Sequence, residues 1–152
     1  MRAHWCCEPA RPVLVGPRGV NPLEAKRALV AWKDTREARR AIRDALPLLH
    51  KAKEVMVVEI AESGRSIEVA DAQSRLRDVV AYLKRHQITV VADRVRPNEG
   101  TVGNAVLRIA QEQSFDLIVA GAYGHSRLGE WLFGGVTQEL LTSSPVCCLL
   151  SH

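Results

Sequence analysis

The strongest constraint on this chain is a strict alternation of short apolar runs with segments of helical periodicity. The runs are nearly continuous in apolar residues, which is typical of strands buried on both faces of a sheet. Between them, apolar residues recur at the i, i+3, i+4, i+7 spacing of helices that cover a sheet. The predicted strands span residues 28–32, 55–60, 88–92, 117–120 and 146–150, and the apolar stripes of the predicted helices span residues 38–49, 69–83, 102–110 and 128–140.

This order of elements predicts one α/β domain of the doubly wound class. Strand–helix–strand crossovers are right-handed, so they build a parallel sheet with helices on both faces, here over about residues 23–152. In such sheets a ligand binds beyond the carboxyl ends of the strands, where the strand order reverses. The segments of functional interest therefore follow Trp32, Ile60, Arg94 and Ala120.

The composition argues against several other classes of protein. The 152 residues are enough for one domain with a sizeable core. Lys and Arg number 21 and are interleaved with 17 Asp and Glu, so the net charge of +4 does not form a nucleic-acid platform. Apolar runs stay far below the ~18 residues of a membrane span, and the start of the chain lacks a signal peptide. We therefore expect a cytoplasmic protein that binds neither nucleic acid nor membrane.

The four cysteines form two adjacent pairs, Cys6-Cys7 and Cys147-Cys148. This spacing fits neither a C-x-x-C zinc or redox motif nor a secreted disulfide framework. Since Cys147 and Cys148 lie within an apolar run, we expect them to act as small hydrophobic side chains.

The turn after the first strand argues against the common nucleotide motifs. It reads Lys33-Asp34-Thr35-Arg36-Glu37, without the glycines of a dinucleotide-binding loop, and no P-loop pattern occurs elsewhere in the chain. Asp34 and Glu37 have the spacing of a capping box, which predicts that Asp34 begins the first helix.

The segment after the fourth strand is the best candidate for a ligand site. Gly121 and Gly124 let consecutive amides turn toward an anion, and a helix start follows at Ser126. Gly134 and Gly135 fall within the last apolar stripe, where each glycine costs about 1 kcal/mol relative to alanine. Either the helix begins only after them, which provides a second amide-rich helix start, or they permit close packing.

Gly121, Gly124 and Gly134, at G-x2-G-x9-G spacing before Val136-Thr137 and the closing Ser144-Pro145-Val146, resemble the universal stress protein family. The resemblance covers about residues 27–152. It implies a five-stranded parallel sheet of order 3-2-1-4-5 and, in one branch of the family, an adenine nucleotide such as ATP, with or without magnesium, on the glycine loop. Members of this kind are stress-response binding proteins more often than fast enzymes.

The resemblance also implies roles for individual residues. Ile60 faces the adenine through its backbone, Thr137 donates a hydroxyl, and Lys33 stands where an acidic residue is usual and is itself a candidate phosphate contact. Gly135 replaces the Ser, Thr or Asn that usually follows the last glycine, and together with Lys33 it favours the non-nucleotide branch. Phosphates are expected against the amides of Gly121, Gly124, Gly134, Gly135 and Val136.

Other site candidates each have a structural alternative. Trp32 either stacks on a base or plugs the core at the rim of the sheet. His125 and Arg127 either meet a phosphate or face solvent, and Ser126 either contacts the ligand or caps the last helix. No second histidine or carboxylate completes a triad or a metal set, so we assign no catalytic residue and no metal ligand.

The first 25 residues are predicted to be an arm outside the domain of residues 26–152. Pro12-Val13-Leu14-Val15 resembles the last strand of a preceding repeat, as in tandem universal stress proteins, and an extended arm is the alternative. The family resemblance implies a homodimer through the last strand, residues 146–150, which pairs antiparallel with its symmetry mate or with the arm. The function expected is an adenine-nucleotide-binding regulatory domain; the alternatives are a dimeric scaffold without nucleotide and a slow ATPase.

Overall fold

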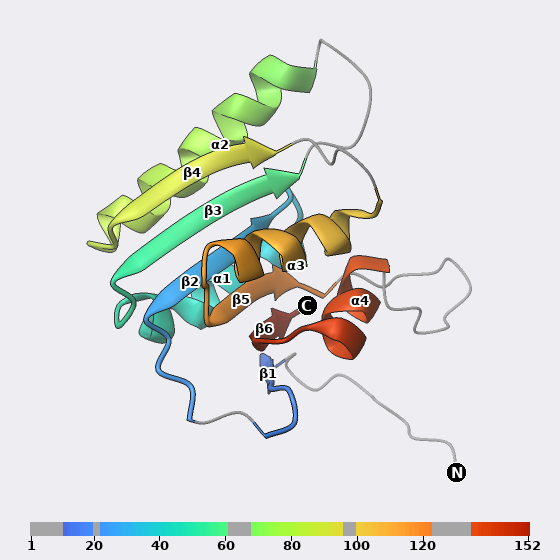
Figure 1. Cartoon of the computed structure of the whole chain (residues 1–152). Helices are drawn as coiled ribbons and strands as arrows, with labels where there is room; N and C mark the ends of the chain where they lie inside the picture. The colour runs from blue at the N-terminus through green and yellow to red at the C-terminus, as the bar shows by residue number, and fades with distance from the viewer. Residues whose placement is uncertain (1–10, 20–21, 61–67, 96–99, 123–134) are drawn as a thin grey trace.

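The computed structural model of the chain describes residues 11–19, 22–60, 68–95, 100–122 and 135–152 (Figure 1). Its elements alternate as the apolar pattern predicts, with one extra strand at the start. The strands are β1 (Val13–Val15), β2 (Arg27–Trp32), β3 (Glu54–Ile60), β4 (Val90–Val95), β5 (Leu117–Gly121) and β6 (Cys147–Ser151). The helices are α1 (Arg36–Leu49), α2 (Glu68–Arg85), α3 (Val102–Glu112) and α4 (Gly135–Ser143).

The six strands form one sheet in the order β1-β6-β5-β2-β3-β4. Pairing is parallel from β6 to β4, and β1 adds antiparallel to β6, with Val13 opposite Leu150 and Val15 opposite Cys148. The expected count of five strands is therefore corrected to six, and the order of the whole sheet differs from the expected 3-2-1-4-5 only by β1, which is added beside β6. The five parallel strands lie as β4-β3-β2-β5-β6, and the arm adds a sixth strand at the edge because β6 leaves its outer backbone groups available for pairing.

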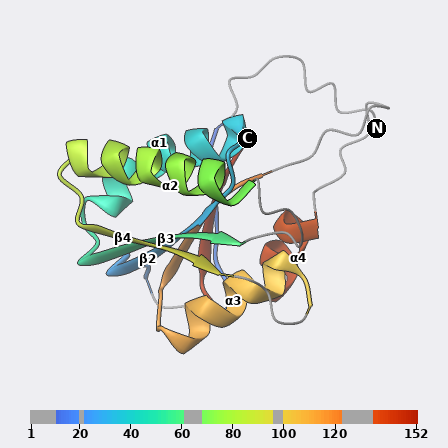
Figure 2. The same cartoon turned by 90° about the horizontal axis from the view of Figure 1, so that it is seen from above.

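Helices cover both faces of the sheet, as the doubly wound class requires (Figure 2). α1 and α2 lie on one face, and α3 and α4 on the other. Side chains alternate accordingly along the buried β2: Val30 packs with the core under α1 and α2, and Leu29 packs with the core under α3 and α4. The continuous apolar runs of the sequence are thus explained by burial on two faces.

α1 and α2 cover different strands on their face of the sheet. α1 lies chiefly against β5 and β6, and α2 lies against β4 and β3. Ser151 of β6 donates a hydrogen bond of 2.6 Å from its Oγ to Oδ2 of Asp44 on α1, which holds the helix over that side of the sheet. The strip over the end of β2 therefore lies between the two helices.

Three predicted boundaries are corrected. α1 is capped by Thr35, whose Oγ1 accepts from the Ala38 amide at 3.2 Å, and not by Asp34. The third predicted strand begins at Val90 instead of Ile88, because the Ile88 amide closes the end of α2 by donating to the Leu83 carbonyl at 3.1 Å. β6 spans Cys147–Ser151 and so starts one residue later than predicted.

Cys147 and Cys148 are buried in β6, and neither forms a disulfide. Burial raises the pKa of both thiols, so the neutral form is favoured. This supports the interpretation of the pair as small core side chains; Cys6 and Cys7 lie outside the described residues. Across the described part of the chain, no helix has the length and apolar character needed to cross a membrane.

Candidate functional site

The carboxyl ends of the parallel strands place several predicted site residues along one edge. Trp32 ends β2 in register with Glu59 of β3, and Ile60 is the last residue of β3. Gly121 ends β5 opposite Ser151. Because β2 and β5 are adjacent and the sheet reverses its order there, this edge is the crevice in which doubly wound proteins bind ligands.

The structure gives a packing reason for glycine at position 121. A Cβ built at this position would lie 2.6 Å from the amide nitrogen of Ala38 and 2.7 Å from the carbonyl carbon of Glu37. These are backbone atoms in the first turn of α1, so they cannot rotate away. Gly121 therefore allows the end of β5 to touch the start of α1.

Gly135 is different, because a Cβ there would meet nothing within 4 Å. It is exposed and is the first residue of α4. Among the described residues nothing packs closely on Gly135, and the described part of α4 begins at this glycine. The first amides of a helix lack intrahelical partners, so a helix that starts at this glycine, as one of the two alternatives has it, would offer donors to an anion.

Of the other predicted contacts in this region, the structure describes only Val136 and Thr137. Val136 is half-buried, and Thr137 is buried with 2% of its surface exposed, so its side chain faces the interior. The predicted helical stripe before Gly135 and five predicted contacts lie outside the described residues: Gly124, His125, Ser126, Arg127 and Gly134.

Trp32 and Lys33 adopt contrasting positions at the end of β2. Trp32 is 7% exposed and belongs to the core under α1 and α2, which favours the core-plug interpretation. Its indole N–H is buried and has no hydrogen-bond partner among the residues that the structure describes. Lys33 is exposed at the edge, and its carbonyl accepts from the Thr35 amide at 2.7 Å in the turn before α1.

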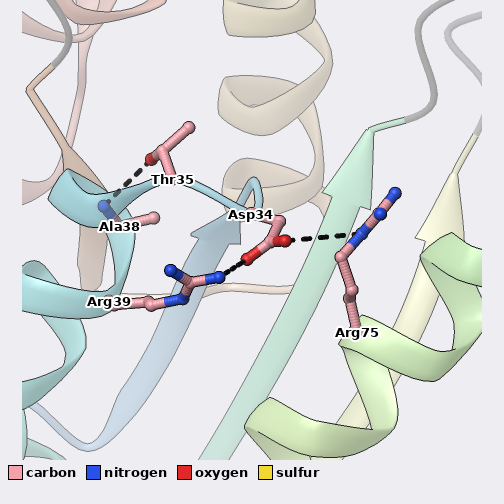
Figure 3. A network of polar contacts seen from close by, with 5 residues as sticks. All are labelled: Asp34, Thr35, Ala38, Arg39 and Arg75. Carbon is pink, nitrogen blue, oxygen red and sulfur yellow. Dashed lines mark hydrogen bonds and ion pairs between the residues drawn. The ribbon is translucent and has the colours of Figure 1, made fainter.

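An ion-pair network at this edge was not foreseen from the sequence. Asp34 bridges Arg39 of α1 and Arg75 of α2, with 3.6 Å between Asp34 Oδ2 and Arg75 Nε (Figure 3). Nearby, Glu59 pairs with Arg94 at 3.3 Å. Burial raises the pKa of Glu59, the positive charges of Arg94 and Arg75 oppose that rise, and Asp34 adds to it. Asp34 thus links α1 to α2, and the Glu59–Arg94 pair links β3 to β4.

A cavity of about 740 Å³ lies between α1 and α2, with Trp32 and Asp34 at its β2 end. Its wall on α1 carries arginines at positions 36, 39, 40 and 43. That i, i+3, i+4, i+7 spacing is visible in the sequence and predicts that the four side chains lie on one face of the helix. In the part of the chain that is described, no three His, Cys, Asp or Glu side chains are grouped to hold a metal ion.

The fold defines a doubly wound α/β protein with a largely parallel sheet, and the candidate ligand site lies at the carboxyl edge of that sheet. The chain belongs to the universal stress protein family, whose model matches residues 24–152. The resemblance inferred from the glycine spacing is thereby confirmed.

Individual relatives agree with this assignment. A universal stress protein of Methanothermobacter thermautotrophicus is 30% identical over 103 residues, which are 66% of this chain and 64% of that protein. The solved universal stress protein of Archaeoglobus fulgidus superposes with a TM-score of 0.71 at 18% identity, over 83% of this chain and 97% of that one. A universal stress protein of the same organism, solved in complex with dAMP, has a TM-score of 0.66 at 15% identity, over 86% and 100% of the two chains.

Proposed function

We propose that this domain is a cytoplasmic stress-response module that binds an adenine nucleotide at the carboxyl edge of its sheet and acts as a binding protein, not as an enzyme. The observation that carries the proposal is that β5 ends at Gly121 on the carboxyl edge of the sheet and that the next described residue, Gly135, is an exposed glycine at the beginning of α4. Amides at such a start favour the phosphates of a nucleotide. A fold relative solved with dAMP supports the adenine nucleotide class.

In this proposal the phosphates lie against the amides of Gly121, Gly124, Gly134, Gly135 and Val136, and the adenine lies by the backbone of Ile60. His125, Ser126, Arg127 and Lys33 are the proposed polar contacts around the phosphates. Thr137 is the least favoured of the proposed donors, because its side chain is buried beneath the helix start.

The first test is the nucleotide content of freshly purified protein, followed by calorimetric titration with ATP, ADP and AMP, with and without magnesium. We expect micromolar binding of at least one nucleotide, and a loss of at least about tenfold in affinity in Gly124→Asp, because a carboxylate in the loop repels phosphate. Gly19→Asp is the matched control. It adds the same charge at an exposed glycine where a Cβ meets nothing within 4 Å; because φ is +79° there, the substitution strains the backbone locally, so circular dichroism must show that the variant is folded.

Absence of binding up to millimolar nucleotide, about 4 kcal/mol or weaker, would overturn the proposal. It would favour the second candidate, a scaffold without nucleotide, which is supported by the packing role of Gly121 against α1. Phosphate release above a blank without protein, abolished in Gly124→Asp, would instead indicate a slow ATPase.

We also propose that β6 is a dimerisation edge that the arm covers. Within this chain, β1 occupies the outer edge of β6 with only three residues, and Val13 and Leu14 remain more than half exposed. A symmetric pairing of β6 with a second copy requires β1 to leave. Light scattering should therefore show a monomer for the intact chain and a dimer after deletion of residues 1–20, since an unpaired edge strand favours association. A monomer in both cases would contradict the proposed dimer edge.

A further inference from the structure

The cavity between α1 and α2 has the dimensions of a small-molecule site. Its volume of about 740 Å³ falls in the range of ligand pockets, roughly 300–1,000 Å³. Trp32, Ile42 and Val79 provide apolar surface from the buried core, and Tyr82 adds an aromatic side chain on α2. The first turn of α1 packs directly on Gly121, so α1 lies between this cavity and the end of β5.

The charge of the cavity is strongly positive. Five arginines line it, but only two aspartates, Asp34 and Asp78. On α1, Arg36 and Arg40 are spaced i, i+4, as are Arg39 and Arg43, and like charges at that spacing destabilise a helix by about 0.2–0.5 kcal/mol a pair. Arg36 also places a positive charge in the first turn, where the helix dipole favours a negative one. Intrahelical stability therefore does not account for Arg36 in the first turn, nor for the pairing of Arg39 with Arg43 at i, i+4.

Neighbouring carboxylates only partly offset this charge. Asp34 serves both Arg39 and Arg75 (Figure 3). Asp44 lies 3.9 Å from both Arg40 and Arg43, which exceeds a hydrogen bond, and its Oδ2 already accepts from Ser151. Arg36 has no ion pair with any residue in the described ranges. Among the described residues, Arg36 and Arg43 thus have few acidic partners on the α1 wall.

We infer that this arginine groove is a second anion site, which binds a small ligand with two or more phosphate groups. Guanidinium groups bind phosphate oxygens in pairs of parallel hydrogen bonds, and several on one helix face suit a chain of phosphates. The limited volume suits a small molecule, whereas the mixed charges of the remaining surface do not extend the groove into a track for nucleic acid. The proposal requires that this site binds its ligand without the glycine loop, none of whose described residues lines the groove.

The test is calorimetric titration of the full chain with inorganic tripolyphosphate at about 0.15 M salt, where exposed charges are largely screened beyond ~8 Å. All variants are made in a Gly124→Asp background, so that the nucleotide site does not contribute. We expect saturable binding that weakens at least about tenfold in the double variant Arg36→Gln/Arg43→Gln, which removes two exposed guanidinium groups. Circular dichroism checks that each variant is folded.

The matched control is Arg77→Gln/Arg108→Gln, which removes the same charge from exposed positions on α2 and α3 that do not line the cavity. Its affinity should change by no more than about twofold, as expected for screened charges. Equal losses in both double variants would assign the binding to net charge and overturn the inference. So would the absence of saturable binding in Gly124→Asp, whether or not the unmodified chain binds tripolyphosphate, because the site must act without the glycine loop.

Discussion

Replacement of Gly121 by alanine is expected to lower the free energy of unfolding by about 3 kcal/mol, the upper range for overpacking of a core. The added Cβ would lie 2.6 Å from the Ala38 amide nitrogen and 2.7 Å from the Glu37 carbonyl carbon. Both atoms belong to the backbone of α1, so relief requires movement of the whole helix or of β5. Urea unfolding followed by far-ultraviolet circular dichroism measures the change.

Gly135→Ala is the matched control for this prediction. Its Cβ would meet nothing within 4 Å, and alanine at a helix start reduces the entropy of the unfolded chain, so the free energy of unfolding should rise or fall by less than about 1 kcal/mol. If the two variants unfolded at the same urea concentration, the close contact between β5 and α1 would be refuted. Retained nucleotide binding in Gly135→Ala is also expected, because the backbone amide remains.

Trp32→Ala should cost about 3–5 kcal/mol, the usual loss for a large buried aromatic side chain. Trp32 is 7% exposed and packs in the core under α1 and α2 at the end of β2. Removal of the indole leaves a space that joins the neighbouring cavity, and its lining loses contacts. Urea unfolding, again by circular dichroism because the variant removes a fluorophore, gives the loss directly.

Trp32→Phe separates packing from base stacking. Phenylalanine keeps most of the buried surface and removes an indole N–H that is buried without a partner among the described residues, so the loss should stay below about 1.5 kcal/mol. Should Trp32→Ala prove nearly as stable as the unmodified protein yet fail to bind nucleotide, the core-plug interpretation would be wrong and base stacking would replace it.

Much of the fold was predictable because the relevant signals are local. The runs containing Leu29, Val57 and Ile118 are buried on two faces, and such strands have to be apolar throughout. The edge strand β4 was placed less well: Val91 is 58% exposed, and the run that predicted the strand began with Ile88, whose amide belongs to the end of α2. The local sequence pattern does not show which backbone amides will donate hydrogen bonds to the end of the preceding helix.

In the candidate site too, some features were predictable from local signals and others depend on tertiary contacts. Trp32, Ile60 and Gly121 were assigned to the carboxyl edge because parallel strands end together. Asp34 was predicted as a helix cap, but it bridges Arg39 and Arg75, and Arg75 reaches it from α2. A cap depends on residues three positions apart, whereas this bridge depends on how α1 and α2 approach each other.

The sequence alone determined the alternating elements, the parallel sheet, the family and the edge at which a ligand is sought, because burial periodicity and glycine spacing are properties of contiguous residues. Only the tertiary structure decided that β1 covers β6, that Gly121 is required by α1 and that an arginine groove separates α1 from α2. These features depend on contacts between residues far apart in the chain. Their energies come from strand pairing and helix placement, which no local pattern encodes.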